Sequence, residues 1–241
     1  MRDLLGVTDI DKAYAVQQLS TNERTSAGSR IVGRKIGLTS PAVQSQLGVD
    51  RPDFGTLFDD MLVSSGGTIP SERLLQPRAE AEIAFVLRED LDGDDLGLPE
   101  VRASVDYAVA ALEICDSRIA DWDITITDTI ADNASSGMFV LGEHPVELSE
   151  FEPARVTMRL TCDGVVVSTG DGAACMGDPL TALAWLARMS TALGTPLRAG
   201  DVILSGALGP MVDVKPGMSV SAEISAVGSV AANFSIEGHR S

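Results

Sequence analysis

The sequence predicts an α+β fold built mainly on antiparallel β-sheet. Few segments show helical periodicity, many short segments alternate apolar with polar residues, and glycine-containing turns separate them. The chain has 241 residues and is 44% hydrophobic, which suits one sizeable core. Because no stretch resembles a linker between separately folding halves, we predict a single domain over residues 1–241.

The first expected element is a short helical segment within about residues 1–28, ahead of a β-rich core. Thr8 followed by Asp11 resembles a capping box and predicts a helix that runs through about Leu19. The stretch from Ile31 to Leu38 then indicates a glycine-rich strand or turn.

The segment from Gln76 to Leu87 predicts a buried strand that carries two acids. Side chains at alternate positions of a strand share a face and stand roughly 7 Å apart, so Glu80 and Glu82 project together. Both faces of this strand are otherwise apolar, and two carboxylates in a dry site repel each other unless a cation neutralises them. The pair therefore indicates a divalent-metal site, although strand glutamates lie more often on a solvated face.

A charged loop from Arg88 to Gly97 follows that strand. Its Asp90, Asp92 and Asp94 suggest a calcium-binding EF-hand, but glycine at the sixth position and glutamate at the twelfth are both missing. We therefore predict a solvated surface turn.

From Val101 onward, Val105, Val109 and Leu112 recur at helical spacing and predict a helix that leads into a strand near Cys115. Glu113 lies in this apolar stretch, so we expect it to be buried or turned toward a site. Three glutamates without histidine or cysteine partners favour Mg²⁺ or Mn²⁺ over zinc.

The C-terminal half adds a hairpin, a helix and a strand. The alternation from Arg155 to Thr169 around Asp163-Gly164 predicts the hairpin. Asp178-Pro179 is typical of a helix start, and Gly194 is placed to end that helix. The alternation that begins at Ser219 predicts a half-buried strand turning at Gly228.

Composition excludes several classes of partner. The 35 acidic residues outnumber the 18 basic ones, and the net charge of -17 disfavours nucleic acid and anionic membranes as partners. The N-terminal segment has no apolar leader region, so we predict a cytoplasmic protein. Three cysteines without a Cys-x-x-Cys spacing predict buried, reduced thiols.

Some further residues are candidates for a site, each with an ordinary structural alternative. Lys35 lies between Gly33 and Gly37, which allow close backbone approach to a ligand, although an ordinary surface lysine is the more common explanation of such a residue. Asp53 fits a Pro-Asp-x-Gly turn as well as a reactive role. The stretch 132–137 offers hydroxyl and N–H groups for a carboxylate, and a plain loop explains it nearly as well.

Five segments in a fixed order carry a resemblance to a known family: Gly33–Thr39, Gly48–Leu57, Gln76–Ala84, Asp128–Ser135 and Gly200–Pro210. They resemble the 2-hydroxypenta-2,4-dienoate hydratases, also called 2-oxopent-4-enoate hydratases, of the fumarylacetoacetate hydrolase superfamily. The similarity covers essentially the whole chain. It implies a mixed β-sandwich or roll of mainly antiparallel strands with a few flanking helices.

The resemblance also implies the site residues. The family's metal-binding glutamates fall on Glu80, Glu82 and Glu113, with Mg²⁺ or Mn²⁺ as cofactor, and its active-site lysine and aspartate fall on Lys35 and Asp53. We assign binding of the small anionic substrate to three more residues: Ser135, Ser136 and Arg78. Cys115 is given no catalytic role.

The implied activity is metal-dependent hydration of 2-hydroxypenta-2,4-dienoate, or a homologue, to 4-hydroxy-2-oxopentanoate in the catabolism of aromatic rings by meta-cleavage. The nearest alternative is 4-oxalocrotonate decarboxylase, which shares the lysine and glutamate motifs. A noncatalytic metal-binding assembly partner is a more distant one. A C–C bond hydrolase is disfavoured, because the only histidines, His144 and His239, lie outside every motif.

The resemblance further implies a homo-oligomer that can associate with 4-oxalocrotonate decarboxylase. Relatives carry about one additional helix before the segment that begins at Met1, so we expect either a shortened or a misassigned start here.

Overall fold

The computed structural model of the chain describes residues 2–40, 44, 49, 51–93 and 96–236. Residues outside this set include Met1, Gly48, Asp50, Asp94 and His239, all of which belong to segments or motifs considered above. The α-helices of the described residues are α1 (Arg2–Leu5), α2 (Ile10–Ser26), α4 (Leu98–Ser104), α5 (Ile126–Ala131) and α6 (Pro179–Ala192).

Two β-sheets form the body of the molecule. The strands are β1 (Ile31–Gly37), β2 (Asp53–Phe58), β3 (Leu62–Ser64), β4 (Thr68–Ile69), β5 (Arg78–Leu87), β6 (Val105–Cys115), β7 (Ser136–Leu141), β8 (Thr157–Cys162), β9 (Val165–Asp171), β10 (Val202–Leu204), β11 (Val212–Asp213), β12 (Ser219–Ile224) and β13 (Gly228–Phe234). The larger, eight-stranded sheet has the order β2-β1-β10-β5-β6-β7-β3, with β11 also paired to β5. The smaller sheet has the order β4-β13-β12-β8-β9.

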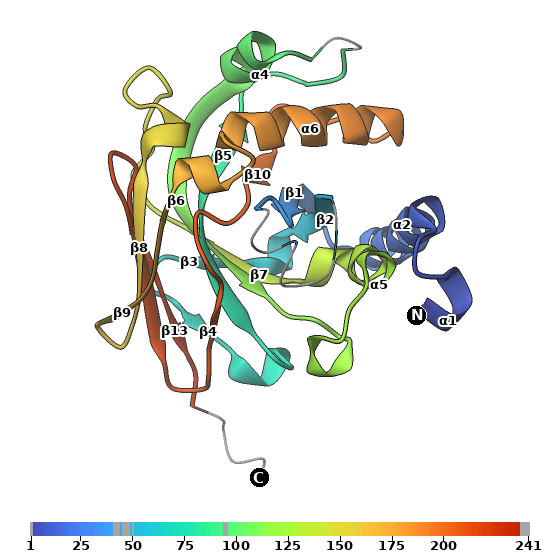
Figure 1. Cartoon of the computed structure of the whole chain (residues 1–241), viewed down its shortest axis with the longest axis horizontal. Helices are drawn as coiled ribbons and strands as arrows, with labels where there is room; N and C mark the ends of the chain where they lie inside the picture. Colours follow the sequence, from blue (N-terminus) through green and yellow to red (C-terminus); the bar gives the residue numbers. More distant parts are fainter. Residues whose placement is uncertain (1, 41–43, 45–48, 50, 94–95, 237–241) are drawn as a thin grey trace.

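Most neighbouring strands are antiparallel, as predicted; the parallel pairs are β1 with β10, β3 with β7, and β4 with β13. The small sheet packs across the middle of the large one, where β12 and β13 contact β6. Figure 1 shows the small sheet on one side of the molecule and α2 and α5 on the other, with α6 and α4 above the large sheet. This arrangement confirms the predicted α+β sandwich.

The centre of the large sheet is covered on both faces. In β5 every residue from Ala79 to Phe85 is buried, and in β6 every residue from Ala108 to Cys115. A sheet covered on both sides needs apolar residues on both faces of its strands. The acids that interrupt β5 and β6 therefore lie in the driest part of the fold.

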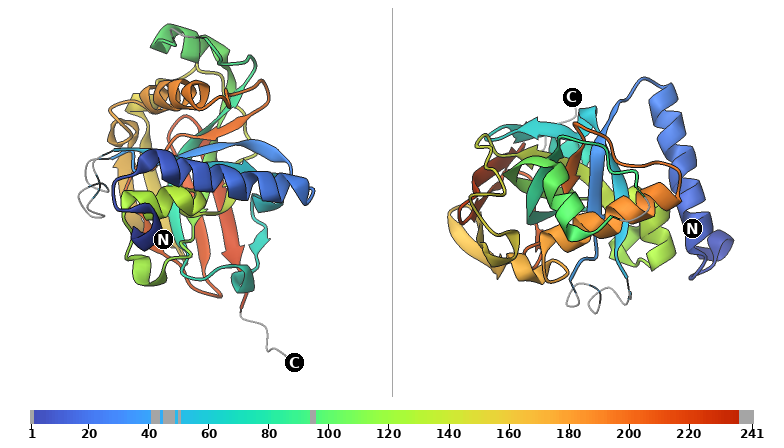
Figure 2. Two further views of the ribbon diagram at one scale, coloured as in Figure 1. Left: turned by 90° about the vertical axis from the view of Figure 1, so that its right-hand side faces the viewer. Right: turned by 90° about the horizontal axis from the view of Figure 1, so that it is seen from above.

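The helices lie at the edges of the large sheet. α2 packs against α5, and α6 contacts β1 and α4. Figure 2 shows α2 running beside α5, below α6 in its left-hand view. None of the helices in the described part of the chain is both long and apolar enough to cross a bilayer.

The predicted helix 101–112 is wrong beyond Ser104. The chain forms α4 only over Leu98–Ser104 and then continues as β6. Because β6 is buried on both faces between β5 and β7, its run of apolar residues also matches a helical spacing. Periodicity alone does not separate the two structures in such a run.

The N-terminal helix is longer than predicted and begins at a different cap. The carboxylate of Asp9, rather than the hydroxyl of Thr8, accepts the backbone N–H of Lys12, at 3.1 Å. α2 then continues to Ser26, well past Leu19.

The C-terminal predictions are confirmed. β8 and β9 form the hairpin around Asp163-Gly164, and β12 buries alternate residues before the turn into β13. The carboxylate of Asp178 caps α6 by accepting the N–H of Leu180 at 2.8 Å. In the loop after β5, Asp90 and Asp92 pair with Arg198 at the surface.

We expect Gly33→Ala to destabilise the fold by about 3 kcal/mol or more, because the new methyl group has to displace backbone. A Cβ atom at Gly33 would lie 1.8 Å from the carbonyl oxygen of Val202, across the β1/β10 pair. Gly93→Ala is the matched control, since a Cβ atom there meets its nearest neighbour, Leu96, at 3.7 Å. Equal urea midpoints for the two variants would contradict this account of β1.

Candidate active site

Three buried glutamates meet where β5 and β6 run side by side. Glu80 is directly opposite Glu113 in the antiparallel register, and Glu82 follows two residues later on the same face of β5. Their exposed fractions are 6%, 1% and 0%, respectively. Carboxylates placed directly across a sheet repel each other, so this cluster costs stability unless positive charge compensates it.

Lys35 brings one such charge. It lies on β1, and its Nζ is 2.9 Å from Oε1 of Glu113, with only 3% of the lysine side chain exposed. β10 separates β1 from β5 and ends at Leu204, level with Lys35 on one side and Ala84 on the other. The end of β10 leaves room for Lys35 to reach the acids.

The acids fit a hard divalent cation. Among the described residues, no hydrogen-bond donor meets Glu82 Oε1 or Glu113 Oε2, although both atoms are buried. Glu82 Oε2 accepts the backbone N–H of Gly206 at 2.7 Å, which fixes the orientation of that carboxylate. Buried carboxylate oxygens that lack donors are the ligands that Mg²⁺ and Mn²⁺ prefer.

Cys115 lies closer to the acids than the sequence suggested. Its Sγ, a carboxylate oxygen of Glu80 and one of Glu113 all lie within 4.8 Å of one another. Burial, followed by the charges of Glu113 and Glu80, raises the pKa of the Cys115 thiol well above its ordinary value. The protonated thiol donates to Glu80 Oε2 at 3.6 Å, so Cys115 supports a ligand rather than adding a thiolate.

Burial shifts the titration of the whole cluster. Burial, with the charge of Glu113, raises the pKa of Glu80 to about 7, and burial and the other two acids raise the pKa of Glu82 well above its ordinary value. Burial acts to lower the pKa of Lys35, but the negative charges around it, Glu113 first, outweigh burial and hold that pKa well above its usual range. Lys35 is therefore a stable cation in this site.

Asp53 stands on the other side of Lys35. It begins β2 opposite Gly37, and a Cβ atom on Gly37 would lie 2.3 Å from Asp53 Oδ1 and 3.4 Å from Lys35 Nζ. Burial raises the pKa of Asp53, whereas Lys35 and a hydrogen bond from Thr129 lower it. Thr129 Oγ1 donates to Asp53 Oδ2 at 3.2 Å.

A small cavity of about 30 Å³ opens beside this cluster. Lys35, Glu80 and Ser135 form its polar wall, together with Thr129 and Cys115; Leu38, Trp122, Ile124 and Met211 form an apolar wall. The cavity has room for a water molecule.

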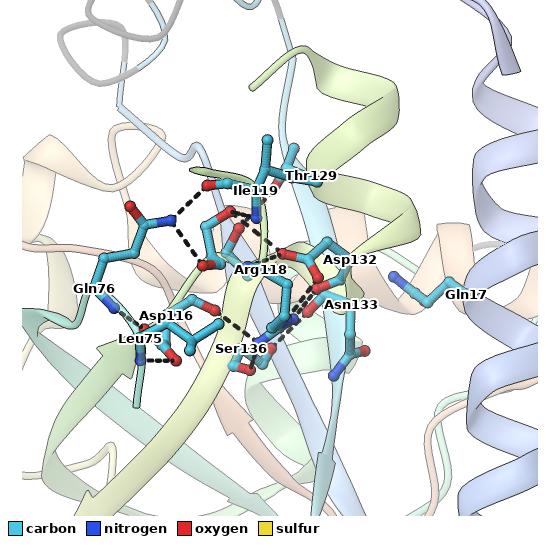
Figure 3. Close-up of polar contacts among 12 residues, drawn as sticks. Gln17, Leu75, Gln76, Asp116, Arg118, Ile119, Thr129, Asp132, Asn133 and Ser136 are labelled. Atoms are coloured by element: carbon cyan, nitrogen blue, oxygen red, sulfur yellow. Dashed lines mark hydrogen bonds and ion pairs between the residues drawn. The ribbon is translucent and has the colours of Figure 1, made fainter. Parts of the chain in front are cut away.

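A strained turn presents Ser135 to the cavity. Asn133, Ala134 and Ser135 have φ values of 55°, 52° and 53°, a left-handed run that side chains other than glycine rarely adopt. The Asn133 amide holds it by accepting from Thr56 N at 2.7 Å and donating to Thr56 O at 2.9 Å. Figure 3 shows Arg118 reaching Asp132 and the Ser136 carbonyl from the other side of the turn.

The structure does not bring every predicted substrate-binding residue into the cavity. The Ser136 hydroxyl donates to the carbonyl of Asn133 at 2.7 Å and faces a separate cleft beside Arg118, so the geometry does not support its predicted role. Ser135 and Ser136 diverge because the chain leaves the left-handed turn between them. Arg78 lies at the rim, with its guanidinium 4.4 Å from the centre of the Trp122 ring and paired to Asp213.

The sequence does not single out Thr129 or Gly206, although each donates a hydrogen bond to an acid of the site. Thr129 lies within the quoted segment Asp128–Ser135 and Gly206 within Gly200–Pro210, but no local signal says which residue of each segment reaches an acid. Both contacts join segments far apart in the chain, so periodicity and turn chemistry do not reveal them.

The fold and the buried acid cluster define a metal-dependent enzyme of the fumarylacetoacetate hydrolase type. The chain belongs to this family: the model for the fumarylacetoacetate (FAA) hydrolase C-terminal region matches residues 30–235. Within the family it is similar to the 2-keto-4-pentenoate hydratase of Paraburkholderia xenovorans, with 56% identity over 97% of this chain and 87% of the relative. The 2-hydroxyhexa-2,4-dienoate hydratase of Comamonas testosteroni is 40% identical over 93% and 86%. The resemblance to hydratases is confirmed.

Solved structures agree with this placement. The 4-oxalocrotonate decarboxylase from Pseudomonas putida, complexed with magnesium and adipate, has a TM-score of 0.92 and 35% identity over 97% of this chain and 88% of that one. A fumarylpyruvate hydrolase from Pseudomonas aeruginosa has a TM-score of 0.67 at 17% identity, over 85% and 89%, which supports the fold.

We expect the metal-free protein to lose stability as pH rises from about 5 to about 8, because Glu80 and Glu82 bind protons more tightly in the folded state than in the unfolded state. For Glu80 the loss begins near the ordinary carboxyl pKa of 4.5 and is complete above about 7. The measurement is the melting temperature of chelator-treated protein across this range. Glu80→Gln should show a smaller fall than the wild type, and Mg²⁺ should abolish the fall; identical profiles for all three samples would contradict it.

Proposed function

We propose that this protein catalyses the metal-dependent hydration of 2-hydroxypenta-2,4-dienoate, or a close homologue, to 4-hydroxy-2-oxopentanoate. The observation that carries the proposal is the dry cluster of Glu80, Glu82 and Glu113 beside the Lys35 ammonium group, at the wall of a cavity. A site of this kind suits an anionic acid that gains negative charge on an oxygen during the reaction. We assign the residues 1–241 to one catalytic domain.

Hydration is favoured over decarboxylation by the relatives and by the cavity. Identity to the xenovorans hydratase is 56%, compared with 35% to the decarboxylase. Trp122, Ile124 and Met211 give the cavity an apolar wall. This wall suits the uncharged end of a monocarboxylate, whereas the decarboxylase substrate carries a second carboxylate there. Arg78, the nearby cation, is already paired with Asp213.

The reaction adds one water molecule without any change of oxidation state overall. The 2-hydroxydienoate first ketonises, so that its hydroxyl proton is lost and its terminal carbon gains a proton. Carbon 4 of the resulting enone is electrophilic and accepts the oxygen of water. Carbon 3 then gains a proton, and the product is the 4-hydroxy-2-oxo acid.

Glu80, Glu82 and Glu113 would hold the Mg²⁺ or Mn²⁺ ion, which supplies Lewis-acid polarisation of the substrate's carboxylate and 2-oxygen. The Lys35 ammonium stands beside the same carboxylates and remains protonated there. It donates a hydrogen bond to the 2-oxygen and so stabilises the negative charge that develops on that atom.

Asp53 is the base for the attacking water. Its burial keeps its pKa above that of an ordinary aspartate, which makes it a better proton acceptor, and Thr129 holds one of its oxygens. Lys35, Gly37 and Thr129 line the cavity, and Asp53 adjoins this wall through its hydrogen bond from Thr129 and its place beside Gly37. Ser135 is placed to bind the substrate carboxylate from the same wall.

We further propose a cytoplasmic homo-oligomer that associates with 4-oxalocrotonate decarboxylase. This part rests on the family resemblance and on the charged N-terminal sequence.

Lys35→Ala should lower kcat about 100-fold or more, because it removes a charge that matters most in the transition state. The affinity for Mn²⁺, measured by calorimetry, should fall far less, since the three carboxylates remain in place. Lys215→Ala, at an exposed lysine, is the control. A parallel loss of turnover and of metal affinity would remove the separate role that we give to Lys35.

The decisive experiment follows the absorbance of freshly generated 2-hydroxypenta-2,4-dienoate, with Mg²⁺ or Mn²⁺ and then with chelator. We expect metal-dependent decay and 4-hydroxy-2-oxopentanoate as product. The same preparation is offered 2-oxohex-3-enedioate, and release of CO₂ there without hydration would favour the decarboxylase. No turnover of either compound with metal present would favour a noncatalytic metal-binding protein.

A further inference from the structure

Helix α2 lies outside the region 30–235 that the family model matches, yet it sends a side chain toward the site. Gln17 lies midway along this helix and is only 5% exposed, although glutamine is usually a surface residue. Figure 3 shows its side chain extending from α2 toward the segment that carries Thr129 and Asn133. A buried amide needs partners, and those of Gln17 show what it does.

The Gln17 amide joins two segments that are far apart in the sequence. Its Nε2 donates to the carbonyl oxygen of Phe54 at 2.8 Å and to that of Ile130 at 2.9 Å. Phe54 directly follows Asp53 on β2, and Ile130 directly follows Thr129 on α5. One NH₂ group therefore bridges the backbones beside both members of the Thr129–Asp53 hydrogen bond.

That hydrogen bond is long and depends on how the two backbones are placed. Thr129 Oγ1 lies 3.2 Å from Asp53 Oδ2, slightly longer than the usual range of about 2.5 to 3.0 Å for O–H···O bonds. A shift of a few tenths of an ångström between β2 and α5 would break it. The carboxylate of Asp53 would then turn away from the cavity side.

Side-chain packing also links α2 to β2, because the Tyr14 ring stacks on the Phe54 ring with centroids 4.7 Å apart. Only Ala13, Tyr14, Gln17 and Thr21 are buried among the residues of this helix, and cavities of about 310 and 330 Å³ lie along it on either side of Gln17. To this packing the Gln17 amide adds a hydrogen-bonded link that reaches β2 and α5 at once.

We propose that Gln17 is a positioning residue for the reaction: it locks β2 to α5 and thereby holds Asp53 in the orientation that Thr129 stabilises. The inference rests on the proposed hydratase activity for its catalytic consequence. Its structural part, the coupling of the two segments by one amide, stands independently of the substrate.

The test uses Gln17→Met, which keeps the length of the side chain and removes both donors. Gln18→Met is the matched control, because Gln18 neighbours Gln17 on α2 but lies at the surface. Among the described residues, its side-chain amide donates only to Asn22. Thr129→Val removes the donor to Asp53, and the double variant of Gln17 and Thr129 completes a thermodynamic cycle.

We expect Gln17→Met to lower kcat about tenfold, with KM and Mn²⁺ affinity within about twofold of the wild type, because a small misplacement acts on the reacting group and not on binding. Thr129→Val should show a similar loss, and the double variant should be little worse than either. Gln18→Met should match the wild type. Full additivity of the two losses, or a higher KM with unchanged kcat, would overturn the inference.

Hydrogen exchange in the Mg²⁺-loaded protein gives a second readout that does not need turnover. Gln17→Met should increase amide exchange in both 53–58 and 126–135, and Gln18→Met in neither. Unchanged exchange in these segments refutes the coupling even if the wild type does not hydrate the dienoate. Failure of the wild-type assay with increased exchange instead refutes only the proposed function.

Discussion

The structure depends on keeping four carboxyl groups buried beside the ammonium group of Lys35. Glu80 faces Glu113 across β5 and β6, Glu82 lies two residues along β5 on the same face as Glu80, and Asp53 stands on the far side of the lysine. In this buried site an uncompensated charge is destabilising, so burial and mutual repulsion raise the pKa values of Glu80 and Glu82 when no cation is bound. Because the arrangement is unstable without a cation, it binds a metal ion strongly. The bound cation and Lys35 then favour negative charge that develops on a substrate oxygen.

The rest of the fold serves this arrangement in identifiable ways. The small sheet covers β6 from one side, which excludes water from the acids. β10 ends at Leu204, so that Lys35 reaches Glu113, and the chain then turns so that Gly206 donates its N–H to Glu82. Gly37 leaves the space that Asp53 occupies. Each feature is small, but together they place groups from four strands within reach of one cavity.

Much of this was predictable from the sequence, and the exceptions share a cause. Acids in an apolar strand are a local signal, so the sequence alone indicates Glu80, Glu82 and Glu113 as site residues. Local signals also predict the hairpin at Asp163-Gly164 and the helix that begins after Asp178. The strand β6 was mistaken in part for a helix because burial on both faces removes alternation. The divergence of Ser135 and Ser136 and the bridge made by Gln17 depend on contacts across more than a hundred residues or on a left-handed turn, which no local pattern encodes.

The two walls of the cavity come from different kinds of structure. Its polar wall is anchored by the strand residues Lys35, Glu80 and Cys115, whereas Trp122, Ile124 and Met211 of the apolar wall lie in connections outside the named strands. Loops tolerate replacement far better than paired strands do. Substitutions in these connections can therefore change which carbon skeleton fits the cavity while the reactive residues stay the same. Members of a family with this fold can thus evolve different substrate ranges and keep one type of reaction.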